Sequence, residues 1–149
     1  MPGDRVERDR ERVDPARASN LAGKIVVDVT NPIGDGPRGS RLVLGHDDSG
    51  GEQVQRWLPE SMVVKTWNTV NHEHMIDPHI PGGPGDMFLC GNDPAAKQTV
   101  ASLVADCGWS PLDAGAIDAS RLMEPLAMLW VGYAMTHGSS DHAFKLLRR

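Results

Sequence analysis

Two apolar stretches of this chain each run directly into a polar loop. Residues 24–29 (Lys-Ile-Val-Val-Asp-Val) lead into Thr30, Asn31 and Pro32, and residues 62–67 (Met-Val-Val-Lys-Thr-Trp) lead into Asn68, Thr69 and Val70. Nearly continuous β-branched runs predict parallel strands that are buried on both faces of a sheet. Ligands of open α/β sheets bind just beyond the carboxyl ends of such strands. We therefore expect these two loops to form a ligand-facing edge.

The remaining pattern alternates between strands and helices. Further strands are predicted at residues 86–90 and 109–113, and helices at 50–58, 94–107 and 118–136. Ser49 with Glu52 three residues later is typical of a capping box, and Asp93 followed by Pro94 is typical of a helix start. Residues 34–50 read as a long loop, and 71–75 as a short helical turn. This order predicts an α/β fold: a partial Rossmann-like sheet of mostly parallel strands followed by C-terminal helices.

Helical spacing also assigns faces to the two longest helices. Val100, Leu103 and Val104 are predicted to share one apolar face. The last helix carries an apolar stripe that we interpret as core rather than as a cofactor contact. This stripe consists of Leu122, Leu126, Leu129, Trp130 and Tyr133.

Composition narrows the class of protein. The chain has 149 residues, which suits one domain, and its net charge of −5 argues against nucleic-acid and membrane-surface partners. No stretch approaches the length of a membrane span, and the charged N-terminus does not resemble a secretory signal, so we expect a cytoplasmic protein. Residues 1–20 contain ten charged residues and few apolar ones. We expect them to be a disordered or loosely helical leader, with the domain over residues 21–149.

Several polar residues are candidates for chemistry. His72, Glu73, His74, Asp77 and His79 could together bind a metal, but the proline-rich surroundings favour a plain polar loop, and we expect no zinc there. The spacing of Cys90 and Cys107 fits neither a metal site nor a disulfide framework, and both are better explained as small apolar side chains than as nucleophiles.

The asparagines of the two loops are stronger candidates. Asn31 and Asn68 each offer an uncharged side chain with a donor and an acceptor, which suits the carboxamide and ribose of a nicotinamide cofactor. The alternative is that they only form turns, above all Asn31 before Pro32. Glu124 has two open interpretations: a partner of a helix dipole, or a polar group at the edge of a site.

From about Leu21 onward, four stretches resemble the NADPH-dependent deazaflavin (coenzyme F-420) reductases of the NADP oxidoreductase family. These stretches are GKIVVDVTNP (23–32), VVKTWNTV (63–70), MFLCGND (87–93) and RLMEPLAMLW (121–130). The resemblance implies NADP(H) and coenzyme F-420 as cofactors, with hydride passing from NADPH to the deazaflavin or a similar acceptor. Residues 30–32, 68–70 and Glu124 would then lie at the cofactor cleft. Such a transfer depends on the placement of the two rings, so we expect no catalytic acid or base.

The N-terminal part of the family's sequences has no matching stretch in this chain. In the family, a strand, a glycine-rich loop and basic residues precede the matching region, and residues 1–20 resemble none of them. We therefore expect no Gly-x-Gly-x-x-Gly turn for a pyrophosphate, a truncated chain and impaired activity. The alternative is a non-catalytic α/β interaction domain or a remnant. An incomplete sheet exposes a strand edge, so we expect a homo-oligomer, with small-molecule cofactors and neither nucleic acid nor membrane as partners.

Overall fold

A four-stranded sheet forms the centre of the computed structural model, which describes residues 18–37 and 39–148. The strands lie in the order β1 (Ile25–Asp28), β4 (Met62–Lys65), β5 (Asp86–Gly91) and β6 (Ser110–Asp113). β1 pairs with β4 and β5 pairs with β6 in parallel, whereas β4 and β5 are antiparallel. The predicted Rossmann-like sheet with mostly parallel strands is confirmed. The predicted leader falls mainly on residues 1–17, outside the described residues.

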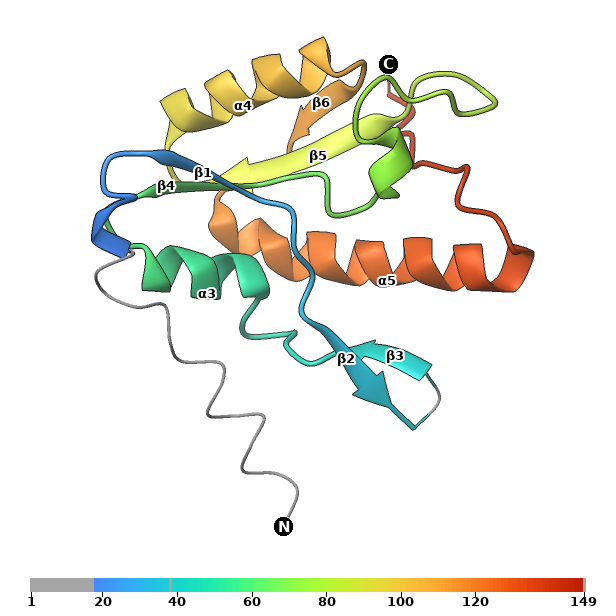
Figure 1. Cartoon of the computed structure of the whole chain (residues 1–149), viewed down its shortest axis with the longest axis horizontal. Helices are drawn as coiled ribbons and strands as arrows, with labels where there is room; N and C mark the ends of the chain where they lie inside the picture. Colours follow the sequence, from blue (N-terminus) through green and yellow to red (C-terminus); the bar gives the residue numbers. More distant parts are fainter. Residues whose placement is uncertain (1–17, 38, 149) are drawn as a thin grey trace.

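Helices cover both faces of this sheet (Figure 1). Helix α4 (Pro94–Asp106) lies on one face, and α3 (Gly50–Trp57) and α5 (Ser120–His137) lie on the other. Neighbouring residues of β4 serve the two faces, because Val64 packs into the α4 layer and Val63 into the α3/α5 layer. Burial on both faces explains why the strands read as continuous apolar runs. No helix within the described ranges is long and apolar enough to cross a membrane.

Local signals set the helix starts as the sequence predicts. The Ser49 side chain accepts a hydrogen bond from the backbone N–H of Glu52, and the Ser49 hydroxyl donates to the Glu52 carboxylate. Asp93 caps α4 through the backbone N–H of Ala96. The last helix begins two residues later than expected, after the short 3-10 turn η2 (Ile117–Ala119). It ends at Gly138, whose φ of 64° is left-handed.

The predicted loop at residues 34–50 is wrong in its first part. A hairpin forms there from β2 (Ile33–Gly36) and β3 (Gly39–Leu42), which are antiparallel. This hairpin contains glycines 34, 36 and 39, so the spacing Gly-x-Gly-x-x-Gly does occur in the sequence, contrary to our expectation. In the structure these glycines join two strands rather than a strand and a helix. They therefore present no helix N-terminus to a phosphate.

The two predicted apolar faces are buried only in part. Leu103 of α4 is 47% exposed, while Val100 and Val104 are buried. In α5, Leu122, Leu129 and Tyr133 are 75%, 61% and 51% exposed. The buried residues of α5 lie on the opposite side of the helix and are Ser120, Met123, Glu124 and Ala127. Both sides of α5 are apolar, so spacing alone could not show which side faces the sheet.

The segment before β5 and the C-terminal segment that packs beside it have little regular structure. The expected helical turn is the 3-10 helix η1 (His72–His74), whose last carbonyl accepts a hydrogen bond from the Trp109 indole. Residues 139–148 form no helix or strand and return to the start of β5. There the backbone N–H of Asp86 donates to the carbonyl of Phe144, and the Asp86 carboxylate accepts from the N–H of Leu146.

Candidate functional site

The two polar loops meet at one edge of the sheet. β1 and β4 are parallel and in register, with Asp28 opposite Lys65, so both strands end at the same level. The chain turns sharply after β4, because Trp67 has a left-handed φ of 54°. This turn brings Asn68 alongside Asn31, which follows β1. The expected ligand-facing edge therefore rests on a short, fixed connection.

Asn31 and Asn68 form a reciprocal pair. The Asn31 amide nitrogen donates to the backbone carbonyl of Asn68 at 2.8 Å, and the Asn68 amide nitrogen donates to Asn31 Oδ1 at 3.0 Å. Asn68 also donates to the carbonyl of Met123 in α5 at 2.9 Å. Both neighbours of the Asn68 nitrogen are oxygens, so the orientation of its amide is fixed. Its Oδ1 is buried and has no hydrogen-bond partner within the described part of the chain.

A buried lysine holds the ends of the two strands together. Lys65 Nζ lies 2.7 Å from Asp28 Oδ2 and 3.1 Å from Glu124 Oε1, and it donates to the carbonyl of Thr30 at 2.7 Å. Asp28 in turn accepts from both the N–H and the hydroxyl of Thr30. Buried charges require such pairing, because desolvation costs several kcal/mol per ion. A lysine inside an otherwise apolar strand is the one sequence signal that could have revealed this network.

Glu124 connects the network to the start of α3. Its two carboxylate oxygens accept from the backbone N–H groups of Gly50 and Gly51, each at 3.0 Å. This is the dipole-partner interpretation of Glu124, although the helix concerned is α3 rather than its own. A Cβ on Gly51 would collide with the Ser120 hydroxyl, so the two helix starts are in close contact. Glu124 is buried among these groups and acts on the edge through Lys65.

The other expected site residues lie around the pair in different settings. Thr30 is exposed, Pro32 is half-buried, and Thr69 is buried. Pro32 fixes the hairpin to the edge, since its carbonyl accepts from the N–H of Val43. Val70 packs against the α4-side core. The structure thus brings Thr30, Asn31 and Asn68 together, whereas Val70 packs into the core on the α4 side of the sheet.

The electrostatics of the edge suit an uncharged ligand group. The ammonium of Lys65 is fully used by two carboxylates and a carbonyl. The first N–H groups of α3 are occupied by Glu124 and so do not serve a phosphate. What remains is the buried acceptor Asn68 Oδ1, the second amide hydrogen of Asn31 and the acceptor capacity of the Thr30 hydroxyl, because the Thr30 hydrogen and the Asn68 amide nitrogen are already used. This set fits a carboxamide or a ribose and does not fit a pyrophosphate.

The histidine loop has its own ion pairs, whereas Cys90 lies opposite Lys65 on β5 and so adjoins the charged network. His74 pairs with Asp141 at 2.9 Å and His79 with Asp77 at 3.4 Å, and the described ranges hold no group of three potential metal ligands. The expected lack of zinc stays a prediction. Cys90 is buried, its sulfur lies 3.3 Å from the Ser120 hydroxyl, and burial raises the pKa of its thiol. It is a neutral core side chain, as the sequence indicates.

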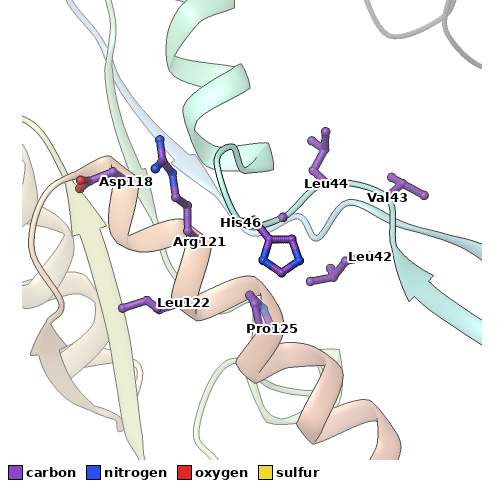
Figure 2. Close-up of a pocket in the computed structure, with 9 residues that line it drawn as sticks. Leu42, Val43, Leu44, His46, Asp118, Arg121, Leu122 and Pro125 are labelled. Atoms are coloured by element: carbon purple, nitrogen blue, oxygen red, sulfur yellow. The ribbon is translucent and has the colours of Figure 1, made fainter.

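A hollow of about 640 Å³ lies beside this region, between the segment that follows β3 and the first turns of α5 (Figure 2). Leu42 and His46 line one side, and Leu122 and Pro125 line the other. Arg121 lies at its rim, where Glu52 binds the guanidinium through two hydrogen bonds of 2.8 and 2.6 Å. The hollow is therefore largely apolar, and its one arginine is already paired.

Comparison with known proteins gives a consistent class of relatives. The chain is 34% identical over 131 residues to the F420-dependent NADP reductase of Methanocaldococcus jannaschii, which covers 85% of this chain and 57% of the relative. It is 33% identical over 118 residues to the metalloreductase STEAP3 of Rattus norvegicus, covering 75% of this chain and 22% of that protein. No protein-family model matches the chain.

Solved structures agree with these matches. A crystal structure from Arthrobacter sp. FB24, provisionally named as an F420-dependent NADP reductase, superposes with a TM-score of 0.83 at 42% identity. That match covers 89% of this chain and 61% of the other. A hypothetical protein from Sinorhizobium meliloti gives a TM-score of 0.58 at 33% identity, covering 70% of this chain and 52% of that one.

The chain is thus a domain with a Rossmann-like sheet whose relatives are named as reductases. Over the matched portion, the chain is similar to the F420-dependent NADP reductases. It spans roughly three fifths of the length of these relatives, at 57% and 61%.

Proposed function

We propose that this chain forms the nicotinamide-facing part of an NADPH-dependent oxidoreductase. In this proposal NADPH supplies a hydride, and a deazaflavin such as coenzyme F-420, or a similar acceptor, receives it. The names of the relatives support NADP and F420 as the two cofactors. The chain spans only part of those relatives, so the activity is proposed for an assembly in which this edge is one wall of the cleft.

The single observation that carries the proposal is the fixed asparagine pair at the carboxyl edge of two parallel strands. Asn68 Oδ1 is a buried acceptor without a partner in the described structure, while its amide nitrogen is held by two oxygens. Buried polar atoms are rarely left unpaired, so such an atom marks a place for a donor. A carboxamide N–H₂ or a ribose hydroxyl is a donor of the right, uncharged kind.

Each residue has a definite role in this proposal. Asn31 and Asn68 bind and orient the uncharged end of the cofactor, and the exposed residue Thr30 lies next to Asn31. Lys65 and Glu124 are positioning residues, because they hold the loops and the first turn of α3 in one arrangement. Misplacement of a reacting ring by ~1 Å can cost a factor of ~100 in rate, so this rigidity would serve the transfer directly.

The same geometry limits the affinity that we expect. The hairpin glycines lie on two antiparallel strands rather than at a helix start, and the N–H groups of Gly50 and Gly51 at the start of α3 are already bound by Glu124. An affinity of 1 μM corresponds to about −8 kcal/mol, which the uncharged edge alone does not supply. We therefore propose that this chain by itself binds NADPH weakly, mainly through the nicotinamide end.

Ligand-observed NMR with the full chain tests this proposal. Saturation transferred from the protein to NADPH should be strongest at the nicotinamide protons and weakest at the adenine protons. Asn68→Ala should abolish the nicotinamide signal. Asn71→Ala is the matched control, because Asn71 is in the same loop but bonds to Glu73 and Ser140 instead. Saturation centred on the adenine, or equal loss in both variants, would contradict the proposal.

A further inference from the structure

A second hollow, of about 350 Å³, lies between the segment before β5 and the C-terminal segment. Residues 80–85 form one side, residues 141–145 form the other, and Tyr133 of α5 completes the lining. The two sides meet at the start of β5, where the backbone N–H of Asp86 donates to the carbonyl of Phe144 at 2.9 Å (Figure 1). None of the lining residues belongs to the asparagine pair or to the charged network behind it, so the proposed site does not account for this hollow.

His142 lines the hollow, and its ring is held in one orientation by Trp130. Its Nε2 lies 3.1 Å from the Trp130 carbonyl, and the Trp130 indole N–H donates to the carbonyl of His142 at 2.9 Å. The two rings also stack, with their centroids 4.6 Å apart and their planes at 21°. Because a carbonyl only accepts hydrogen bonds, Nε2 must carry the hydrogen. In the neutral imidazole, Nδ1 is therefore an acceptor.

This Nδ1 atom lacks the donor that it requires. It is buried and has no hydrogen-bond partner among the described residues, as is true of Asn68 Oδ1 at the asparagine pair. Buried polar atoms are rarely left unpaired, so Nδ1 marks a place for a donor that those residues do not supply. Because Nδ1 is covered, a donor reaches it through a small shift of residues 141–145, which form no helix or strand.

The charged side chains at the hollow already have partners. Asp141 Oδ1 lies 2.9 Å from His74 Nε2, and Lys145 Nζ lies 3.6 Å from Asp86 Oδ1. A charged ligand would have to compete with one of these pairs. The lining therefore favours an uncharged ligand.

An aromatic wall and the size of the hollow narrow the ligand further. The half-exposed ring of Tyr133 is tilted by 58° against the ring of His142, with their centroids 4.7 Å apart. Such a wall suits another aromatic ring, packed edge-to-face or offset. Ligand pockets typically enclose ~300–1,000 Å³, so a hollow of about 350 Å³ fits a molecule of one ring.

We propose that this hollow binds an uncharged, single-ring aromatic compound whose O–H or N–H group donates to His142 Nδ1 while its ring packs against Tyr133. Phenols and pyrimidine bases share this chemistry. The site uses none of the residues of the nicotinamide-facing edge, so it does not depend on the proposed hydride transfer.

NMR of the full chain, observed at the imidazole nitrogens, tests this proposal at about pH 8, above the ordinary histidine pKa. The resonance of an acceptor nitrogen moves upfield when the nitrogen gains a hydrogen bond, so the His142 Nδ1 signal should move as phenol or uracil is added. Anisole and dimethyluracil are the matched controls, because each keeps the ring and lacks the donor, and neither should move the signal.

The two probes also distinguish the kind of donor. A shift with phenol alone supports a site for an O–H ligand, and a shift with uracil alone supports a site for an N–H ligand. No shift with either probe, or equal shifts with the probes and their methylated controls, would overturn the proposal.

Removal of the Tyr133 ring tests the aromatic wall. Tyr133→Ala should weaken the binding of the probe that moves the Nδ1 signal by about two- to tenfold, because an aromatic contact is lost. Leu129→Ala is the matched control, since Leu129 is also an exposed side chain of α5 and does not line the hollow. It should leave the affinity unchanged. Equal affinities of the two variants would overturn the placement of the ligand ring.

Discussion

Lys65 Nζ lies between the carboxylates of Asp28 and Glu124, at 2.7 and 3.1 Å, and all three side chains are buried. The group carries one positive and two negative charges. The remaining negative charge faces the N–H groups of Gly50 and Gly51 at the positive end of α3. One cation therefore joins two strands and two helices directly behind the asparagine pair.

Removal of this cation should be costly. Lys65→Met leaves two buried carboxylates unpaired, and we expect it to lower the free energy of unfolding by about 3–5 kcal/mol. Lys97→Met is the matched control, because Lys97 pairs with the mostly exposed carboxylate of Asp113. This substitution should lower the free energy of unfolding by at most about 1 kcal/mol. Urea titrations of both variants provide the comparison. Equal losses would show that the buried network contributes no more than a surface ion pair.

The contact between the starts of α3 and α5 should make the stability of the fold sensitive to one added methyl group. Gly51→Ala places a Cβ against the Ser120 hydroxyl, so we expect a loss of about 1–3 kcal/mol from overpacking. Gly132 is also helical, but a Cβ there meets open space, and Gly132→Ala should stabilise the chain by up to about 1 kcal/mol. Thermal unfolding of the two variants should therefore shift in opposite directions. Shifts in the same direction would contradict the close contact between α3 and α5.

The ion pair between Glu52 and Arg121 predicts a pH dependence. The hydrogen bonds from Arg121 lower the pKa of Glu52, with burial acting in the opposite direction. A carboxyl whose pKa is lower when folded stabilises the protein above its unfolded pKa of about 4.3, and this contribution is lost as the pH falls through the folded value. Glu52→Gln should therefore lower Tm at pH 7 and have a smaller effect at pH 3.

Glu60→Gln is the control for this measurement, since Glu60 is exposed and the described residues give it no ion pair. Its effect on Tm should be small at both values of pH. A Glu52→Gln effect that grows on acidification would show that the pair does not stabilise the folded state through the ionised carboxylate.

Features that depend on short-range chemistry were predictable from the sequence. The Ser49 cap, the Asp93-Pro94 start and the two loops after β1 and β4 all follow from neighbouring residues. The meeting of these loops follows from parallel pairing alone. The link from Lys65 to Glu124 joins residues far apart in the sequence, and no local pattern encodes it.

Other features escaped prediction because competing patterns were equally good. The hairpin of β2 and β3 is rich in glycine and lacks an alternating apolar face, so it read as a loop. In α5 both Met123 and Leu122 belong to apolar stripes, and only the packing against the sheet decides that Met123 is inside. Asn68 was a candidate by its residue type, whereas its bond to the carbonyl of Met123 required the fold.

The proposed role of the asparagine pair can be measured in a hybrid enzyme. Residues 21–149 are joined to the part of the Methanocaldococcus jannaschii reductase that the chain does not match. Transfer from NADPH to a deazaflavin is then followed by the change in its absorbance. Asn68→Ala should lower the rate by up to ~100-fold, because the freed loop no longer fixes the ring. Asn31→Ala should lower both rate and stability, since Asn31 also donates to the Asn68 backbone. Asn71→Ala should leave transfer unchanged. A folded hybrid that binds NADPH and reduces neither a deazaflavin nor a flavin would refute the catalytic proposal and favour an interaction domain.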